Sequence, residues 1–175
     1  MELTRMIELR HFTHADRDAI RDVLLSVHAK IPEYPPGDPF VARFPWFVDH
    51  WGGHPGFTCV IGYDGDEPIG FAYGAPLADG HEWWRDGLRP PPERTRTYGL
   101  SELMVRPRWR KTGASDRLHG ALLANRTEDL SVLLVDIEHP RVEARYEKWG
   151  YGRVGIRRPF PDSPVFAVMV KYLDG

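Results

Sequence analysis

The feature that most constrains this chain is a basic turn set between an apolar strand pattern and a helical pattern, within residues 100–123. Pro107 cannot donate to a strand ladder, so the strand should end before it. Gly113 has no Cβ, so the backbone there can bend sharply and approach a ligand closely. Apolar residues then recur at helical spacing over residues 118–122, which predicts a helix that begins near Gly113 or Ala114.

The start of this helix is expected to bind an anion. The first N–H groups of a helix have no intrahelical partner, and the helix dipole adds partial positive charge. Four basic side chains surround this point: Arg106, Arg108, Arg110 and Lys111. Together these features predict a phosphate or pyrophosphate site. An ordinary strand-to-helix turn with solvated basic side chains is the alternative that the segment leaves open.

Composition limits the class of protein. With 175 residues and 42% apolar residues, the chain can build the core of one domain, residues 1–175. Its net charge of −2 gives no basic excess of the kind typical of nucleic-acid binding. Cys59 is the only cysteine, so no disulfide can form within the chain, and a reducing, cytoplasmic location is expected. No apolar run is long enough to span a membrane, and residues 1–5 lead into polar sequence without a signal-peptide core.

Periodicity predicts alternating strands and helices along the chain. Strands are expected at residues 7–12, 57–63, 69–75, 97–105, 131–137, 152–158 and 165–173, and helices at residues 13–29, 114–123 and 141–149, with a short one near Pro45. The strand at 131–137 is nearly all apolar, so it should be central and buried on both faces. The helix before it predicts a parallel, right-handed crossover.

Two irregular stretches hold candidates for a substrate pocket. Residues 31–40 contain four prolines and a glycine, a density that neither a helix nor a central strand tolerates. Loops on a rigid scaffold often carry binding groups, so Glu33 and Tyr34 are candidates there. The long loop at residues 76–96 offers Trp83 and Trp84. These tryptophans either form a wall of the pocket or pin the loop to the body of the protein, and the sequence leaves both roles open.

Two motifs resemble the GNAT acyltransferase superfamily. The spacing Arg110-x-x-Gly113-x-Ser115, directly after a Val-x-Pro at residues 105–107, resembles the coenzyme A pyrophosphate loop of that family, Arg/Gln-x-x-Gly-x-Gly/Ala. Ser115 is a mild departure, because serine is still small. The motif is not the phosphate loop of nucleotide hydrolases, which ends in Gly-Lys-Ser/Thr.

The second motif follows the central apolar strand. Tyr146, Gly150 and Tyr151 fall on the tyrosine, glycine and aromatic positions of the family pattern Asn-x-x-Ala-x-x-x-Tyr-x-x-x-Gly-Phe/Tyr. His139 and Val142 depart from its asparagine and alanine. Histidine can still hydrogen-bond a pantetheine amide, whereas valine is bulkier and would narrow the cofactor groove. The motifs cover the second half of the chain, and the first half is similar in element order only.

The resemblance implies a fold and a reaction. The fold is α+β, an αβα sandwich in a single GNAT-like domain. Its mixed, mostly antiparallel sheet has about seven strands, with helices on both faces and a central parallel pair splayed to hold the acyl donor. The implied reaction is direct transfer of an acetyl group from acetyl-CoA, as co-substrate, to a primary amine of a small molecule. No metal is required.

The resemblance also assigns roles. Glu102 would act as general base and Tyr146 would protonate the leaving thiolate, although a solvent-facing strand residue and a packed helix aromatic are the plain alternatives. The implied cofactor-binding residues are Met104, Val105, Arg110, Lys111, Thr112, Gly113, Ala114, Ser115 and His139. Backbone groups of Met104 and Val105 would meet the thioester end of the donor and could stabilise the developing oxyanion. Glu33, Tyr34, Trp83 and Trp84 remain the substrate-binding candidates.

Two other functions stay open at this stage. The same fold could use a longer acyl-CoA or an aminoacyl-tRNA as donor, because a basic run also suits an RNA backbone. The chain could also be a ligand-binding module without catalysis. We expect no membrane partner and no nucleic acid apart from tRNA under the first alternative. A homodimer, the commonest assembly of soluble oligomers, stays open as well.

Overall fold

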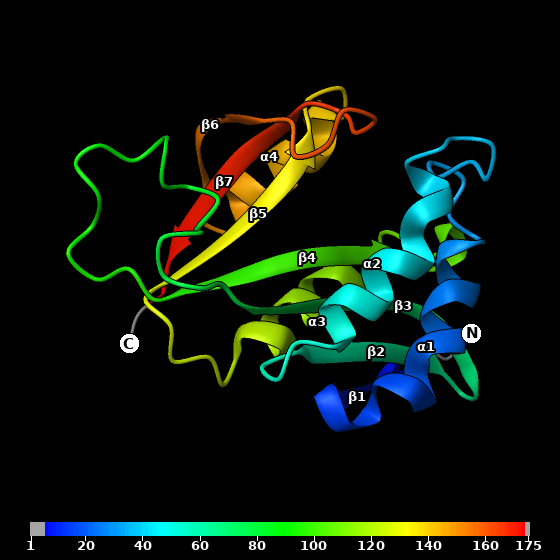
Figure 1. Cartoon of the computed structure of the whole chain (residues 1–175). Coiled ribbons are helices and arrows are strands. Elements are labelled where there is room, and N and C mark those ends of the chain that lie inside the picture. The colour runs from blue at the N-terminus through cyan, green and yellow to red at the C-terminus, as the bar shows by residue number, and fades with distance from the viewer. Residues whose placement is uncertain (1–5, 174–175) are drawn as a thin grey trace. The chain divides into compact units, whose positions relative to one another are not determined.

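The computed structural model describes residues 6–173 and builds them around one mixed β-sheet (Figure 1). The strands are β1 (Glu8–Thr13), β2 (Thr58–Asp64), β3 (Glu67–Pro76), β4 (Thr97–Val105), β5 (Leu130–Asp136), β6 (Gly152–Arg157) and β7 (Phe166–Tyr172). The helices are α1 (Arg17–His28), α2 (Phe44–Gly52), α3 (Ala114–Leu123) and α4 (Pro140–Lys148), with 3₁₀ turns at His14–Asp16, Val41–Arg43 and Pro107–Trp109. The predicted order of elements is confirmed.

The strand order in the sheet is β1-β2-β3-β4-β5-β7-β6. The pairs β1–β2, β2–β3, β5–β7 and β6–β7 are antiparallel, and β4 pairs with β5 in parallel. This confirms the predicted mixed, mostly antiparallel sheet with a central parallel pair. The parallel register joins Thr97, Tyr98 and Gly99 to the first residues of β5. The splay predicted farther along these strands stays a prediction.

The described residues form two compact units, which we treat separately. Unit 1 comprises residues 6–74 and 102–125, and unit 2 comprises residues 75–101 and 126–173. The boundary passes through β3 and β4, so each of these strands contributes to both units.

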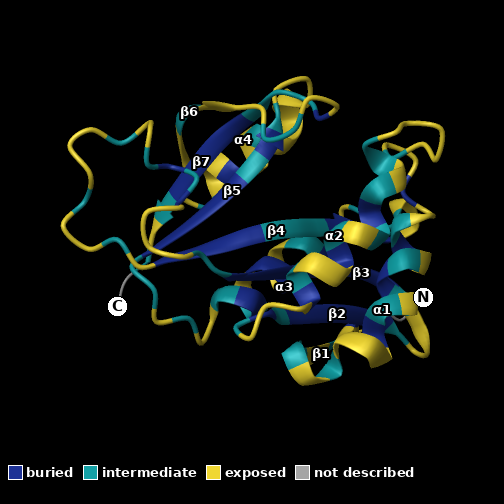
Figure 2. Cartoon of the chain, viewed as in Figure 1, coloured by how far each residue is buried: buried dark blue, intermediate teal, exposed yellow. Residues whose placement is uncertain are grey.

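In unit 1, alternation along the strands separates two buried faces of the sheet. Cys59, Ile61 and Tyr63 of β2 share one apolar cluster with Leu24 of α1 and Phe44 of α2, because successive strand side chains point to opposite faces. Figure 1 shows α1 and α2 on this face and α3 on the other. Both faces of β2 and β3 are therefore buried, as the dark strands of Figure 2 show. The prediction of helices on both faces holds for this unit.

In unit 2, the long loop before β4 supplies much of the core. Trp84 is fully buried and packs with Leu130 and Val132 of β5 and with Val168 of β7. Its indole N–H donates to Thr97 Oγ1 at 2.9 Å, so the polar atom of this large side chain is satisfied. The loop is therefore held to β5 and β7 through this residue.

Local signals in the sequence set the ends of several helices. The Thr13 N–H donates to the Asp16 carboxylate at 2.9 Å, and a 3₁₀ turn then leads into α1. Pro45 lies in the first turn of α2, where its missing N–H costs no helical hydrogen bond. Gly150 has φ of +98° directly after α4, as expected for a glycine that ends a helix.

Three sequence predictions concern location: no membrane span, no signal peptide and a reducing, cytoplasmic compartment. None of the helices described here is long and apolar enough to cross a membrane. The prediction about a signal peptide falls on residues 1–5, which lie outside the described residues. Cys59 is a free thiol with no exposed surface. The cytoplasmic location stays a prediction.

Candidate active site

The end of β4 lies unusually close to β3. A Cβ built on Gly70 of β3 would approach Met104 O to 2.5 Å and the Val105 Cα to 3.1 Å. Only glycine fits there without displacing the backbone of β4. The Arg106 N–H donates to Ile69 O at 2.8 Å immediately afterwards. The backbone at Met104 and Val105, which we predict to meet the acyl donor, is thus held in place by direct contact with its neighbour.

The basic turn that follows, residues 106–113, is anchored by an aromatic ring. Trp109 is buried, and its indole N–H donates to the Asp64 carboxylate at 2.9 Å. The Arg106 guanidinium lies 4.8 Å from the centre of the Trp109 ring. The Thr112 hydroxyl donates to Trp109 O. The turn therefore has a fixed shape before any ligand binds.

The backbone of the turn presents a row of free donors. Lys111 and Gly113 have left-handed φ angles of +62° and +84°, and α3 begins at the next residue. In the part of the chain that the structure describes, the N–H groups of residues 111–115 donate to no protein acceptor, and the first bond back to the turn comes from Arg117 N–H to Gly113 O. Successive N–H groups in such a conformation form an anion-binding concavity.

Carboxylates neutralise two of the four basic side chains at the turn. Arg106 pairs with Glu67 at 2.7 Å, and Arg110 pairs with Glu33 at 2.6 Å. Arg108 and Lys111 have no carboxylate partner among the described residues. The net positive charge beside the free donors therefore comes from these last two. A diphosphate group suits this site for three reasons. The N–H donors are uncharged, Arg108 and Lys111 supply positive charge, and the open space beside Gly113 leaves room for the ligand.

Arg110 differs from the role that the resemblance implies. Its N–H donates to Pro107 O at 3.2 Å, so this amide is not free as those of residues 111–115 are. Its side chain is also engaged, because Nε donates to Val105 O at 3.0 Å and both terminal nitrogens donate to Glu33. Arg110 thus holds parts of the protein together at this site.

Glu102 of β4 is an isolated carboxylate. It is partly buried, and its side chain makes no hydrogen bond or ion pair within the described part of the chain. Burial raises the pKa of the Glu102 carboxyl from 4.5 to about 8, because the charged form loses hydration. In its ionised form, which predominates above about pH 8, a carboxylate with such a pKa is a stronger base than an ordinary glutamate.

In unit 2, Tyr146 lies on α4 with only 8% of its surface exposed. Trp149 and Tyr151 approach its ring edge-on, at centroid distances of 5.2 and 5.8 Å. The Tyr151 hydroxyl is itself 2.8 Å from Ser131 Oγ in the interior. The aromatic motif of the sequence therefore forms a packed cluster that fixes the Tyr146 ring.

The two departures from the second family motif, His139 and Val142, lie at the start of α4. His139 precedes the helix, and its carbonyl accepts the N–H groups of Val142 and Glu143. Its half-exposed imidazole lies 3.7 Å from the Asp136 carboxylate. The Val142 side chain is exposed. His139 thus has a structural task at the helix start, and its side chain remains accessible to a ligand.

The substrate candidates fall into three environments. Glu33 is exposed and bound to Arg110, whereas Tyr34 stacks on His28 with 5.2 Å between ring centres. Trp84 takes the packing role, since it has no exposed surface with which to meet a substrate. Trp83 is partly exposed and lines a cavity of about 350 Å³ in unit 2. Residues of the loop, of β6 and of β7 also line that cavity: Asp86, Gly87, Val154, Gly155, Ile156, Arg157 and Val168.

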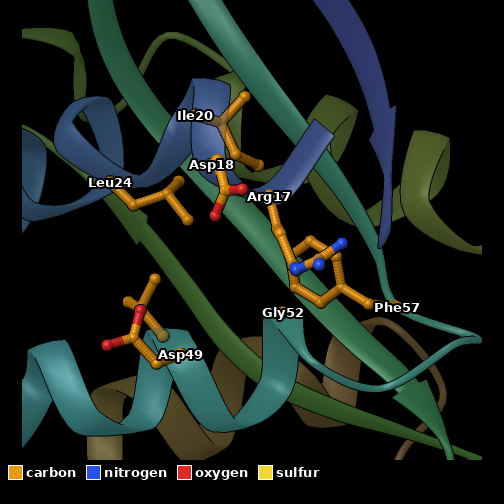
Figure 3. Close-up of a pocket in the computed structure, with 8 residues that line it drawn as sticks. Arg17, Asp18, Ile20, Leu24, Asp49, Gly52 and Phe57 are labelled. Atoms are coloured by element: carbon orange, nitrogen blue, oxygen red, sulfur yellow. The ribbon is translucent and has the colours of Figure 1, made fainter. Parts of the chain in front are cut away.

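A second cavity, of about 220 Å³, lies in unit 1 between α1 and α2 (Figure 3). Asp18 of α1 and Asp49 of α2 lie on the facing helices around it, and Leu24 and Phe57 contribute apolar surface. Arg21 donates to Asp49 at 2.7 Å and joins the same two helices. None of the predicted site residues lines this cavity, so we assign it to helix packing.

Sequence reasoning missed three features of the site. The Glu33–Arg110 pair joins residues 77 positions apart, and no local pattern signals it. The stack of His28 on Phe44, 3.9 Å between ring centres, depends on tertiary packing in the same way. Gly70 carried a weak signal, because a glycine inside a strand pattern often marks a close backbone approach.

The comparisons with known proteins agree with this geometry. The sequence model of the acetyltransferase (GNAT) family matches residues 20–151. No curated protein sequence matches the chain. Similar solved structures include histone acetyltransferase HPA2 and related acetyltransferase from Corynebacterium glutamicum, 19% identical with a TM-score of 0.65, covering 97% of both chains. NAA60 from Arabidopsis thaliana, in complex with a bisubstrate analogue, is 14% identical with a TM-score of 0.66 and covers 97% of this chain and 100% of its own.

A third similar structure is a NatC complex bound to Gag peptide and CoA, 14% identical with a TM-score of 0.63, covering 96% of this chain and 99% of that chain. At these identities the solved structures establish the fold alone. The family match, in contrast, spans most of the chain, from α1 to the residue after Gly150. The protein therefore belongs to the GNAT family of acetyltransferases and is an acyltransferase.

Proposed function

We propose that the protein transfers an acetyl group from acetyl-CoA to a primary amine of a small molecule, by direct transfer without a covalent enzyme intermediate. The observation that carries this proposal is the row of N–H groups at residues 111–115 that donate to no acceptor among the described residues. Arg108 and Lys111 lie beside it and pair with no described carboxylate. Main-chain donors in this arrangement suit the diphosphate of coenzyme A. Acetyl-CoA supplies an activated thioester.

The residues of the chain would divide the work as follows. Lys111, Thr112, Gly113, Ala114 and Ser115 hold the diphosphate through their N–H groups. Met104 and Val105 present backbone groups to the thioester end of the donor, and His139 offers its accessible imidazole to the pantetheine arm. Trp83 and Tyr34 are the aromatic acceptor-side candidates that keep accessible surface, and aromatic faces attract a cationic amine.

Two side chains move protons in this scheme. Glu102 takes a proton from the attacking ammonium or amine, directly or through water, since an amine must be neutral to attack. Tyr146 gives a proton to the departing thiolate, and its packed ring keeps the hydroxyl in a fixed direction. Each role needs only a single proton transfer.

Binding of the donor tests the proposal most directly. We expect coenzyme A to bind the wild-type protein with a micromolar dissociation constant in isothermal titration calorimetry. The double variant Arg108→Ala/Lys111→Ala should bind at least tenfold more weakly at low salt, because it removes the two unpaired cations. Arg94→Ala is the matched control, since it removes an exposed positive charge from unit 2 and should leave the affinity unchanged. Absence of binding at high micromolar coenzyme A would overturn the proposal.

A peptide N-terminus is the second candidate for the acceptor. The similar NatC structure is bound to Gag peptide and CoA, so in that protein a peptide and CoA are found together. Release of free coenzyme A thiol from acetyl-CoA, measured with a panel of small primary amines and of short peptides, separates the two candidates. Turnover with small amines alone supports the first, and turnover confined to peptides supports the second.

A further inference from the structure

An ion pair joins the basic turn to the proline-rich segment, residues 31–40. Arg110 Nη1 donates to Glu33 Oε1 at 2.6 Å, and Nη2 donates to Glu33 Oε2 at 2.8 Å. Such a two-pronged, charge-assisted arrangement fixes the orientation of both groups. Arg110 also donates from Nε to Val105 O at 3.0 Å. One guanidinium group therefore links the end of β4, the basic turn and the proline-rich segment.

The residue after Glu33 provides a second attachment for the same segment. The Tyr34 ring stacks on His28 at an angle of 11°, and His28 stacks on Phe44 at 6°. Phe44 belongs to the core of unit 1, with 4% of its surface exposed. The segment is thus attached in its middle at Glu33 and Tyr34 and near its ends at Ile31, which lies in the core, and Phe40, whose ring contacts Phe47, while residues 35–39 are exposed.

The positive charge of Arg110 is neutralised by Glu33 in this ion pair. Because the Glu33 carboxylate neutralises it, Arg110 adds little net attraction for an anionic donor, in contrast to Arg108 and Lys111. Its N–H is also bonded, to Pro107 O. The side chain therefore serves the protein's own architecture, and what it holds is the proline-rich segment on which the acceptor candidate Tyr34 lies.

We propose that Arg110 is a positioning residue, which fastens the proline-rich segment to the basic turn through Glu33 and thereby presets the wall on which the acceptor amine binds. Glu33 acts as the anchor of this wall and is not a ligand of the amine. The inference rests on the proposed function for the acceptor role of the segment, whereas the fastening itself depends only on the described contacts.

The test is a double-mutant cycle with Glu33→Gln, Arg110→Gln and the double variant. Two quantities are measured: hydrogen exchange of the amides in residues 31–40, and the KM of the best amine at saturating acetyl-CoA. Each single variant should speed exchange in the segment and raise the KM three- to tenfold, with kcat within twofold of wild type. The double variant should be no worse than the poorer single variant, because the singles remove the same interaction. Glu93→Gln, an exposed glutamate of unit 2, is the matched control and should change neither quantity.

The affinity of Glu33→Gln for coenzyme A distinguishes the remaining outcomes. It should equal or exceed that of wild type, because the change leaves the Arg110 charge without its Glu33 partner beside the donor site. A loss of affinity equal to the rise in KM would overturn the inference, because Glu33 would then belong to the donor site. Unchanged exchange in residues 31–40, or single effects that multiply in the double variant, would also overturn it. If the wild type fails to bind coenzyme A, the proposed function is wrong. The hydrogen exchange of residues 31–40 in the wild type and the variants then decides alone whether Arg110 holds the proline-rich segment in place.

Discussion

At the scale of single residues, environment decides what a glutamate can do. Glu33 is exposed and paired with Arg110, so its carboxylate serves as a structural anchor. Glu102 is partly buried and unpaired among the described residues, and burial raises the pKa of its carboxyl to about 8. The same side chain therefore serves as an anchor at one position and as a candidate base at the other.

Glu102→Gln should abolish the pH dependence that this carboxyl confers. In the wild type, kcat/KM should rise with pH and level off above about pH 8, because only the ionised carboxylate accepts a proton. The variant should be slower by about 10²-fold at pH 8 and should lack this rise. A pH–rate profile of both proteins, with an amine found in the panel, measures the difference.

The thermal stability of Glu102→Gln, measured over the same pH range, is the control for its effect on rate. A carboxyl whose folded pKa lies above its unfolded pKa of about 4.5 destabilises the fold progressively as pH rises from 4.5 to 8. Glutamine carries no such charge. The thermal midpoint of the variant, relative to that of the wild type, should therefore increase as pH rises from 4.5 to 8. Equal pH–rate profiles in both proteins would rule out Glu102 as the base.

His28→Phe should make the fold less sensitive to acid. Burial between Tyr34 and Phe44 lowers the pKa of the His28 imidazole to about 4, so the folded state keeps it neutral where the unfolded state is protonated. Wild-type stability should therefore fall as pH drops from about 6.5 to 4, and phenylalanine removes this titration while it keeps a ring in the stack. Between pH 7 and pH 5, we expect the variant to lose about 1 kcal/mol less of its free energy of unfolding than the wild type loses.

Urea denaturation at both pH values measures this effect. His11→Gln, a change at an exposed histidine of β1, is the control and should show the wild-type loss of stability. A similar loss in His28→Phe and wild type would contradict the assignment of the acid sensitivity to His28.

At the scale of elements, the basic turn depends on one left-handed glycine. A Cβ on Gly113 meets nothing within 4 Å, so the glycine is needed for its φ of +84° and not for space. Gly113→Ala should destabilise the fold by about 1 kcal/mol. We expect coenzyme A affinity to fall about tenfold as the turn relaxes and its donors lose their alignment, measured by calorimetry.

Gly120→Ala supplies the matched control on the same helix. Gly120 is a helical residue of α3 without a positive φ, and a Cβ added to it would meet nothing within 4 Å. Alanine there should raise helix stability by up to about 1 kcal/mol and leave coenzyme A affinity unchanged. Equal affinities for all three proteins would show that the turn does not bind the donor.

Elements whose signals are local could be predicted from the sequence. Pro45 at the start of α2 and Gly150 after α4 act through their own backbone, and the structure confirms both. The role of Trp84 could not be decided in this way. Its burial depends on Leu130 and Val132, which lie more than 40 positions away, so the loop sequence alone fits both a pocket wall and a core residue.

At the scale of the whole molecule, the two motifs of the family lie in different units. Glu102 and the basic turn belong to unit 1, whereas Tyr146 and His139 belong to unit 2. Sequence motifs identified these residues because their spacing is local within each unit. The Glu33–Arg110 pair could not be identified from a motif, because its two residues are 77 positions apart and meet only in the folded structure of unit 1.

Donor binding should stabilise the whole chain. At a coenzyme A concentration 100 times its dissociation constant, the expected stabilisation is about 2.7 kcal/mol, which corresponds to a rise in thermal midpoint of roughly 5–10 °C for a chain of this size. Differential scanning fluorimetry measures the shift. Pantetheine, which lacks the diphosphate, should give a much smaller shift at the same concentration, and an equal one would contradict the role of residues 111–115.

The buried position of Cys59 has a practical consequence. The only sulfhydryl of the native chain is enclosed in unit 1, and burial raises its pKa far above the usual range, so it should be inert towards aromatic disulfide reagents. Colorimetric detection of released coenzyme A then needs no protein blank. The same inertness makes the chain a clean host for a single engineered cysteine, to which a fluorophore or spin label could be attached without removing the native one.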